Sequence, residues 1–389
     1  MNAQQRAALP ELARVFLRLG STAFGGPAAH TALLHQELVV RRQWLSEEQF
    51  LDLVSAANLI PGPNSTELVI HIGLQRAGFA GMLVAGLCFI APAMFSVLLL
   101  AAAYVRFGSL PAALALLAGV QPVVVAVVAH ALLGLGRAAL RRWQTLLIAV
   151  CGMMLALAGV NEVGLLVAGA AAGWWLLGSP QLRVPPAAAL LVPAFAAVTA
   201  LPFALPVLFL IFLKIGAVLY GSGYVLLAFL RADLVVRLGW LTERQLLDAV
   251  AAGQLTPGPL FTSATFIGYI LGGLPGAMLA TLGIFLPAFI FVPLTQPLLA
   301  RLRSQQGAAG LLAGVNAAAL GLLAAVAGQL AWGLKVGGDS QANTDADRQQ
   351  ITRVAWSTSF PKRFVDGPMH LTLLLAFCLR YFNKPPQAN

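Results

Sequence analysis

The chain has 389 residues, of which 59% are hydrophobic and 10% are charged. Soluble domains carry about 25% charged residues, and disordered chains are rich in charge and poor in apolar residues, so both classes are excluded. The formal net charge is +10. The basic residues stand singly in short loops. This pattern favours a role in setting the orientation of the helices and in contacting lipid headgroups over a role in binding nucleic acid. The composition therefore predicts a polytopic membrane protein with no nucleic-acid partner.

Apolar stretches long enough to cross a hydrocarbon core of about 30 Å recur along the whole chain. In chain order they are 79–105, 112–136, 143–160, 162–178, 187–213, 275–299 and 308–333. The stretches 12–34 and 208–230 are also apolar but contain the cations Arg18 and Lys214. Residues 1–10 lack the pattern of a cleaved signal peptide. We therefore expect an all-α bundle of transmembrane helices.

An internal repeat is the strongest feature of the sequence. Residues 16–63 align without a gap on residues 212–259, at an offset of 196, with 22 identities in 48 positions. After one deleted residue the alignment continues at an offset of 195. Tryptophan, aspartate, glutamate and arginine coincide as well as alanine and leucine, so shared composition does not explain the match. The sequence therefore predicts two homologous repeats.

The repeats divide the chain into four parts. We place an N-terminal repeat at 1–180, a connection at 181–204, a C-terminal repeat at 205–335 and a tail at 336–389. The first repeat closes with an apolar helix pair at about 143–178. The tail instead begins with a polar stretch and has one short apolar segment, 369–382, which is marginal for a crossing. We therefore expect the tail to diverge from the first repeat.

Each repeat contains a Pro-Gly-Pro sequence between two short helix-like pieces. Proline removes a backbone donor and clashes with the preceding turn, so two prolines around a glycine should end a helix. Irregular backbone is tolerated in a bilayer only where it is buried in protein or lines a cavity, and interrupted helices at matched repeat positions indicate a transporter binding site. We therefore predict broken, re-entrant helices whose N-terminal amides bind an anion. The alternative is a structural kink.

The residues predicted to bind the substrate lie at these two breaks and just after them. They are Pro61, Gly62, Pro63, Asn64, Ser65, Thr66, Thr256, Pro257, Gly258, Pro259, Thr262 and Ser263. Their hydroxyl and amide groups can cap the following half-helix or line a cavity. In the alternative reading they only satisfy backbone groups that the break leaves free.

Two cations and two glycines complete the predicted substrate site. Arg18 and Lys214 occupy the same repeat position inside apolar segments, where a charge usually faces the bundle interior or water. A cation that snorkels to a membrane face is the alternative. Gly25 and Gly221 belong to glycine-rich sequences that occur in both repeats. They allow close helix packing, which we favour, or a second break in the backbone.

Glu67 and His71 are four residues apart after the first break, so they share one helix face. Neither recurs in the second repeat. Carboxyl and imidazole groups can relay protons inside membranes, so we predict a proton-coupling role, with an intrahelical polar pair as the alternative. The sequence contains no metal-ligand spacing and no phosphate-binding loop. This predicts a protein that is not an enzyme, uses no metal or cofactor, and depends on an ion or substrate gradient.

With these motifs the sequence resembles the chromate ion transporter family in its long, two-domain form. The resemblance covers about residues 10–335. In the first repeat it rests on the sequences at 24–27, 58–67 and 71–73, and in the second on those at 212–216, 221–224, 239–242, 253–259 and 283–287. It implies two inverted repeats in a bacterial inner membrane.

The resemblance also implies a function. Members of the family are secondary transporters that export chromate, a tetrahedral oxyanion, and so confer chromate resistance. Proton-motive force or anion exchange would drive them, with protons or a counter-anion as partners beside the lipid bilayer. Sulfate has the same shape and charge, so a carrier of sulfate or another oxyanion is one alternative, and an anion channel on the same repeat is another. A homodimer is a candidate assembly.

Overall fold

A computed structural model describes residues 3–24, 26–108, 110–177, 202–221, 223–302 and 306–341. Within these ranges the chain forms helices joined by short turns, and no strand occurs there, which confirms the all-α prediction. The predicted connection as far as residue 201 and the tail from residue 342 onward lie outside the described residues.

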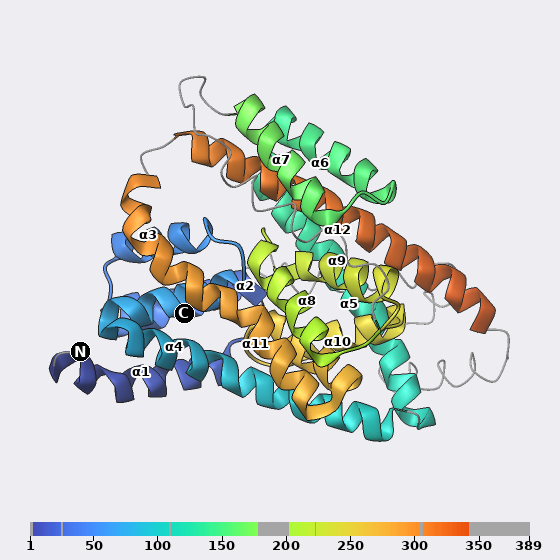
Figure 1. Ribbon diagram of the computed structural model, residues 1–389, viewed down its shortest axis with the longest axis horizontal. Coiled ribbons are helices and arrows are strands. Elements are labelled where there is room, and N and C mark those ends of the chain that lie inside the picture. The colour runs from blue at the N-terminus through green and yellow to red at the C-terminus, as the bar shows by residue number, and fades with distance from the viewer. Residues whose placement is uncertain are drawn as a thin grey trace, which may run out of the picture.

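The two repeats have the same order of α- and π-helices (Figure 1), and the second has two short 3₁₀-helices in addition. The first contains α1 (Ala3–Thr22), α2 (Gly26–His35), the π-helix η1 (Gln36–Arg41), α3 (Glu47–Ala57), α4 (Asn64–Phe107) and α5 (Pro111–Ala139). The second contains α8 (Leu205–Val218), the 3₁₀-helix η4 (Gly223–Val225), α9 (Leu226–Leu230), the π-helix η5 (Arg231–Arg237), α10 (Glu243–Leu255), the 3₁₀-helix η6 (Leu260–Thr262), α11 (Ser263–Leu302) and α12 (Gln306–Gln341). The apolar pair α6 (Trp143–Leu157) and α7 (Glu162–Leu177) follows α5 and packs along α12 of the other repeat.

The helix that precedes each Pro-Gly-Pro begins at a capping box. The Ser46 hydroxyl accepts from the amide of Gln49, and the Gln49 side chain accepts from the amide of Ser46. Thr242 and Gln245 repeat the arrangement at the start of α10. Two otherwise free amides are satisfied at each start. The sequence fixes these helix starts locally, and so fixes the length of helix before each break.

Helix α4 is a hairpin of two arms. Its backbone is not helical at Ala77 and Gly78, where φ of Gly78 is 62°. In one straight helix, Gly73 and Gly81 would lie about 12 Å apart. Instead each is so close to the carbonyl of the other that neither position has room for a Cβ. The chain therefore doubles back between an arm at 64–76 and an arm at 79–107.

Helix α11 repeats this hairpin. Its backbone departs from helical geometry at Gly272 and Gly273, where φ of Gly273 is 60°, and Gly268 contacts Gly276 as closely as their equivalents do in α4. The arm that follows each Pro-Gly-Pro is therefore short. At 13 residues, 64–76 spans about 20 Å, less than the thickness of a hydrocarbon core. These arms confirm the predicted re-entrant helices.

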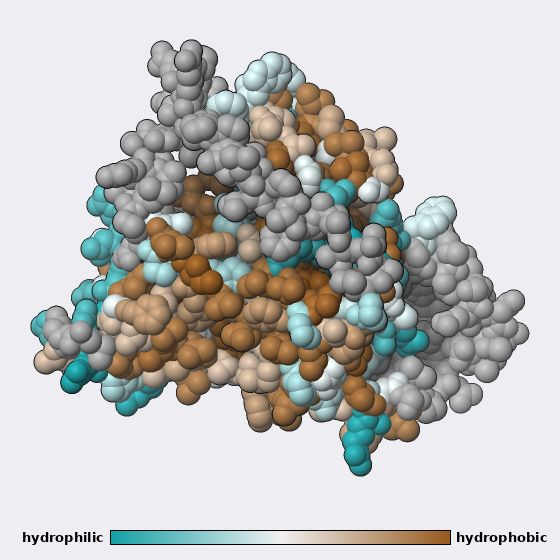
Figure 2. Space-filling view, in the orientation of Figure 1, coloured by the Kyte–Doolittle hydropathy of each residue, from teal (hydrophilic) through white to brown (hydrophobic). Residues whose placement is uncertain are grey.

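Three helices are long and apolar enough to cross a membrane by length and composition: Asn64–Phe107, Leu260–Thr295 and Gly310–Trp332. Because the first two double back, only their second arms are long enough to cross, and these are the candidate crossing arms. Much of the surface in Figure 2 is hydrophobic, and hydrophilic residues gather toward its edges. Large apolar side chains such as Phe79, Phe95 and Leu294 are exposed there or on other faces. A surface of this kind suits contact with lipid.

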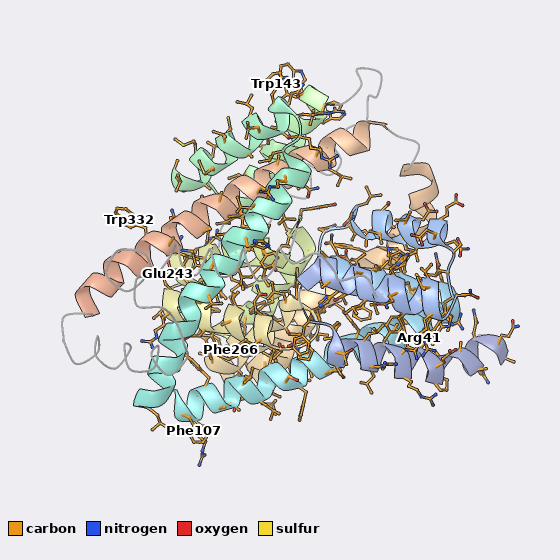
Figure 3. The ribbon with its side chains drawn as sticks, turned by 180° about the vertical axis from the view of Figure 1, so that it is seen from behind. Arg41, Phe107, Trp143, Glu243, Phe266 and Trp332 are labelled. Carbon is orange, nitrogen blue, oxygen red and sulfur yellow. The ribbon has the colours of Figure 1, made fainter. Side chains whose placement is uncertain are left out.

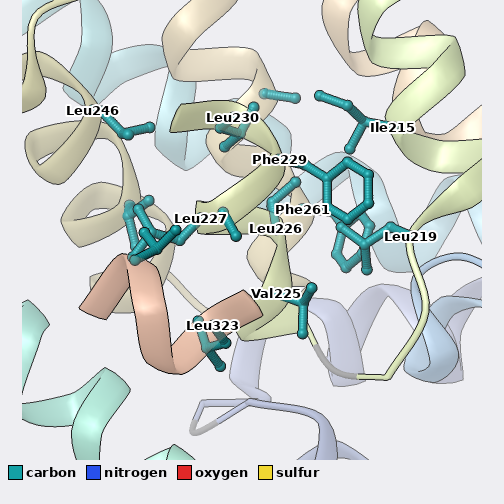
Figure 4. Close-up of a cluster of buried hydrophobic side chains, with 14 of the residues drawn as sticks. Ile215, Leu219, Val225, Leu226, Leu227, Phe229, Leu230, Leu246, Phe261 and Leu323 are labelled. Atoms are coloured by element: carbon teal, nitrogen blue, oxygen red, sulfur yellow. The ribbon is translucent and has the colours of Figure 1, made fainter. Parts of the chain in front are cut away.

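The buried core of the described residues has a large cluster around the second repeat, a smaller one around α1 to α4, and a third, small one between α4 and α11. Figure 4 shows part of the larger cluster, where Phe229, Phe261 and Leu323 come from three different helices. Seen from behind, Phe266 lies among the central helices, whereas Trp143 and Trp332 project from the outer helices (Figure 3). The core therefore joins α12 to the breaks of the second repeat.

The glycine-rich sequences break the backbone, contrary to the packing role that we favoured. Helix α1 ends at Thr22 and α2 begins at Gly26, while α8 ends at Val218 and the next helical residue is Gly223. Gly26 and Gly221 both have a positive φ, 81° and 102°. The apolar stretches 12–34 and 208–230 are thus each interrupted. Glycine permits this because it has no Cβ to oppose a left-handed backbone.

Candidate functional site

The two Pro-Gly-Pro breaks lie at the interface between the repeats. The Gly62 amide donates to the Leu219 carbonyl at 2.8 Å, and the Gly258 amide donates to the Ala23 carbonyl at 2.8 Å. Leu219 and Ala23 are equivalent positions, 196 residues apart. Each break is therefore closed by the other repeat, at the point where its first helix ends.

Both glycines are required by the backbone. Gly62 has φ 137° and Gly258 has φ 101°, a region that side-chain-bearing residues rarely adopt. A Cβ on Gly258 would lie 2.6 Å from the Cβ of Ala93, and one on Gly62 would collide with the Glu67 carboxyl. The prolines Pro61 and Pro257 are half-buried, and Pro63 and Pro259 are buried. The breaks are thus compact, with no room for a larger central residue.

The first break lies beside the middle of a crossing arm. The buried His30 of α2 contacts both Ser65, at the start of the short arm, and the ring of Phe89, near the centre of 79–107. Gly20 of α1 packs on the backbone of Phe89, and Gly258 packs on Ala93. The C-terminal end of α1, the start of the short arm and the second break therefore meet around residues 89–93.

At the first break, polar groups remain available. The Asn64 side-chain amide donates to the Asn58 side chain at 2.7 Å, and the Ser65 hydroxyl lies 3.2 Å from Nδ1 of His30. The Thr66 hydroxyl is fully buried and has no hydrogen-bond partner among the described residues. The amides of Thr66 and Glu67 donate to the carbonyl of Pro63 at 2.7 and 3.0 Å, which leaves the amides of Asn64 and Ser65 as the free backbone donors of this helix start. These two amides and the Thr66 hydroxyl are therefore the donors available at the start of the short arm.

At the second break, the hydroxyl hydrogens are already used. Thr256 donates to the carbonyl of Ala252 at 3.0 Å, Thr262 to that of Pro259 and Ser263 to that of Leu260, both at 2.8 Å. These residues follow the alternative reading, in which side chains satisfy freed backbone. An oxyanion has only acceptor oxygens, so a hydroxyl whose hydrogen is engaged offers it little. The two breaks are therefore chemically unequal.

Glu67 and His71 lie on the short arm after the first break, and both are fully buried. Neither carboxylate oxygen and neither ring nitrogen has a hydrogen-bond partner in the described part of the chain. They are thus not joined to each other as an intrahelical hydrogen-bonded pair. Buried polar groups usually have partners, and unpaired ones call for an explanation such as a role in function.

The two predicted cations have different surroundings. Arg18 is exposed on α1, whereas Lys214 is buried and forms an ion pair with Asp233 at 2.5 Å. Asp233 also pairs with Arg237, which lies 3.4 Å from Glu162. Lys214 therefore belongs to a buried network in which two cations meet two carboxylates. Its role in substrate binding, like that of Arg18, stays a prediction.

The two predicted glycines are only partly described. Gly221 is exposed, and a Cβ at this position would lie 3.5 Å from side-chain atoms of Asn316 and Ala319 in α12. Gly25 lies outside the described residues. Their place in the site thus also stays a prediction.

Two side chains near the breaks were missed from the sequence. His30 has no equivalent in the repeat, since Leu226 occupies that position. The Tyr220 hydroxyl donates across the repeats to the carbonyl of Leu59 at 2.6 Å. The sequence could have indicated both, because each lies in or just after a glycine-rich sequence. Where such a sequence breaks a helix, backbone amides and carbonyls lose their helical partners, and a polar side chain nearby can bond to them.

Comparison with known proteins agrees with this architecture. The profile of the family described as "Chromate transporter" matches residues 10–174, in the N-terminal repeat, and 207–387, which cover the C-terminal repeat and most of the tail. The chromate transport protein of Cupriavidus metallidurans is 32% identical over 330 residues, which cover 81% of this chain and 80% of that protein. The chromate transport protein of Pseudomonas aeruginosa is 34% identical over 344 residues, which cover 83% and 81%. No solved structure matches the chain significantly.

The family match extends over both repeats, and the relatives align over four-fifths of their own length. The resemblance drawn from the motifs is thereby confirmed. The relatives are named as transport proteins, and their family is one of transporters rather than enzymes. The chain, a helical membrane protein built from two repeats, belongs to the chromate transporter family.

Proposed function

We propose that the chain is a secondary carrier that exports chromate from the cytoplasm across a bacterial inner membrane and so confers chromate resistance. The names of the relatives support chromate as the substrate. The observation that carries the proposal is the set of buried polar groups at the first break, beside the middle of the long arm of α4: the unpartnered Thr66 hydroxyl, and the Ser65 hydroxyl next to His30. A chromate dianion needs donors from several directions, because all four of its oxygens accept hydrogen bonds.

In the proposed site, the start of the short arm forms the main contact. Helix N-termini bind anions through free amides and the positive end of the helix dipole. Asn64, Ser65 and Thr66 add side-chain donors, and Pro61, Gly62 and Pro63 hold the backbone open. We assign a supporting role to the second break, where Thr256, Thr262 and Ser263 stabilise the bend through backbone carbonyls.

Glu67 is proposed to couple the carrier to protons, together with His71. An unpaired carboxylate is costly in a buried site, and more so beside a dianion, so Glu67 should take up a proton when chromate binds. Exchange with a counter-anion is the other proposed energy source. Lys214 adds to the positive potential at the site only when Asp233 releases it, since the two are paired in this structure.

Uptake of radiolabelled chromate into inverted membrane vesicles tests the proposal. We expect saturable uptake of intact chromate against its gradient, with competition by sulfate and loss on addition of a protonophore. Loss on removal of an internal anion would instead indicate exchange. Vesicles without the protein are the control. Absence of chromate uptake, or uptake that never exceeds the equilibrium level, would contradict a chromate carrier, and the second result would indicate a channel.

A further inference from the structure

His30 joins the two breaks through one short chain of hydrogen bonds. Its Nε2 lies 3.1 Å from the carbonyl oxygen of Ala23, and its Nδ1 lies 3.2 Å from the Ser65 hydroxyl. The same Ala23 carbonyl accepts from the Gly258 amide at 2.8 Å. The imidazole, 1% exposed, therefore connects the donors of the first break to the backbone of the second.

The geometry assigns the hydrogens. A carbonyl oxygen only accepts, so Nε2 of His30 must carry a hydrogen. In the neutral ring, Nδ1 then has no hydrogen and accepts, so the Ser65 hydroxyl donates to it. Ser65 consequently turns its hydrogen away from the break and presents only lone pairs, which repel an oxyanion.

Protonation of the ring reverses the second of these bonds. Imidazolium carries hydrogens on both nitrogens, so Nδ1 would donate to the Ser65 oxygen. The Ser65 hydrogen is then free to turn toward the break. One proton thereby adds a positive charge beside the site and converts Ser65 from an acceptor into a donor.

We propose that His30 is a proton-sensitive positioning residue that switches Ser65 between these two states and so links oxyanion affinity to protons. The inference rests on the proposed oxyanion function and adds a residue and a regulation to the same site. Linkage is reciprocal, so a bound dianion also favours protonated His30. Rising pH removes the proton, returns Ser65 to its acceptor state and weakens binding.

No neighbouring charged group among the described residues forms an ion pair with the His30 ring, so its protonation can depend on the ligand at the site. The elements packed against α2 include α4, η1, α3 and η4. Their titratable groups include Glu67 and His71 on α4, Glu37 and Arg41 on η1, which pair with each other at 3.3 Å, Glu47 on α3, which pairs with His35, and Tyr224 on η4. None of these groups forms an ion pair with the ring of His30, whose polar contacts are Ser65 and Ala23.

Two substitutions separate the contacts of the ring. His30→Gln places an amide donor near Nε2, so it can keep the bond to Ala23 but leaves the Ser65 hydrogen free. His30→Asn places an acceptor near Nδ1, so it can hold the Ser65 hydrogen but loses Ala23. Neither side chain titrates. His35→Gln, at a half-buried position later in α2 where the ring pairs with Glu47, is the matched control.

The test is the pH dependence of KM for chromate uptake into vesicles, from pH 6 to 8.5. Protonation of chromate itself is common to all variants and cancels in the ratio to wild type. We expect the wild-type KM to rise with pH by up to about tenfold per unit, as a one-proton linkage allows. His30→Gln should stay near the low-pH value and His30→Asn near the high-pH value, while His35→Gln should follow wild type.

Ser65→Ala gives an independent arm, because it keeps His30 and its bond to Ala23. We expect its KM to rise with pH less steeply than that of wild type, because the charge of the ring still acts but the Ser65 donor is lost. If His30→Gln and Ser65→Ala both retain the wild-type profile, the inference is overturned while chromate transport stands. Absence of wild-type uptake would instead overturn the proposed function itself.

Discussion

Gly62 and Leu219 belong to different repeats, yet the amide of one donates to the carbonyl of the other at 2.8 Å. The equivalent bond joins Gly258 to Ala23. Each break therefore takes its shape partly from the repeat to which it does not belong. Movement of one repeat against the other must strain or break these two bonds. A carrier that rocks its repeats would change both breaks together.

The conformation of the two glycines leads to a first prediction. Alanine at Gly62 or Gly258 would force a positive φ on a side chain and collide with Glu67 or Ala93. Backbone strain of this kind costs about 1–3 kcal/mol. We expect either variant to lower the melting temperature in detergent and to reduce chromate uptake.

Gly134→Ala is the matched control for these variants. Gly134 lies in α5, and a Cβ there would meet no atom within 4 Å. Alanine in a helix interior is favoured over glycine by about 0.5–1 kcal/mol. The control should melt at the same temperature or higher and transport normally. Equal effects of all three substitutions would show that the breaks impose no special backbone requirement.

The prolines of the breaks lead to a second prediction. Pro61→Ala and Pro257→Ala allow the helix before each break to continue, because the missing donor is restored and the clash removed. We expect normal amounts of protein in the membrane but reduced chromate uptake. Pro10→Ala, at an exposed position in α1, should leave uptake unchanged. Wild-type uptake by both break variants would remove these residues from the binding site.

Lys214 and Asp233 lead to a third prediction, in which stability and binding are separated. Lys214→Gln leaves the buried Asp233 with Arg237 alone, without the second of its two cations. Breaking a buried ion pair from one side typically costs about 3–5 kcal/mol. We expect a clear fall in melting temperature, whereas Arg18→Gln, at an exposed position, should cause little change.

The double variant Lys214→Gln with Asp233→Asn removes both charges and should recover much of the lost stability. Its chromate KM then tests the predicted role of Lys214 without a misfolding effect. A raised KM in the double variant supports a place for Lys214 in the anion pathway. A wild-type KM would confine Lys214 to the buried ion network with Arg237 and Glu162.

Several features could be predicted from the sequence. The repeat is visible when the chain is aligned with itself, and the helix starts and the re-entrant breaks each have a local cause. Ser46 and Thr242 start helices through their own hydroxyls, and proline ends a helix wherever it stands. The hairpin turns at Gly78 and Gly273 were harder to predict. The apolar pattern continues through them, and only contact between the arms, at Gly73 and Gly81, shows that the chain doubles back.

The partners of the site residues could not be read from the sequence. Lys214 meets Asp233 across a turn and Gly62 meets Leu219 across the repeats, and both contacts depend on tertiary packing. The inequality of the two breaks is also a tertiary property. Ser65 contacts a histidine 35 residues earlier in the chain, whereas Ser263 donates to the carbonyl of Leu260, three residues earlier. Both serines follow a Pro-Gly-Pro, so the motif alone suggests the same role for each.

The burial of Glu67 leads to the last prediction. Its carboxyl group is fully buried and has no hydrogen-bond partner among the described residues. Glu67→Gln keeps the shape of the side chain but removes the site that can gain and lose a proton. Because no ion pair is broken, the melting temperature should be unchanged or higher. We expect uptake by this variant to lose its stimulation by an imposed pH gradient, while exchange of labelled for unlabelled chromate continues.

The control for this variant is Glu48→Gln, which changes an exposed carboxylate in the first turn of α3. It should respond to the pH gradient as wild type does. Uptake by Glu67→Gln that still rises with the gradient would show that the proton enters elsewhere, and His71→Gln would then become the decisive variant. Loss of exchange as well as of gradient-driven uptake would place Glu67 in substrate binding, because proton coupling alone leaves exchange intact.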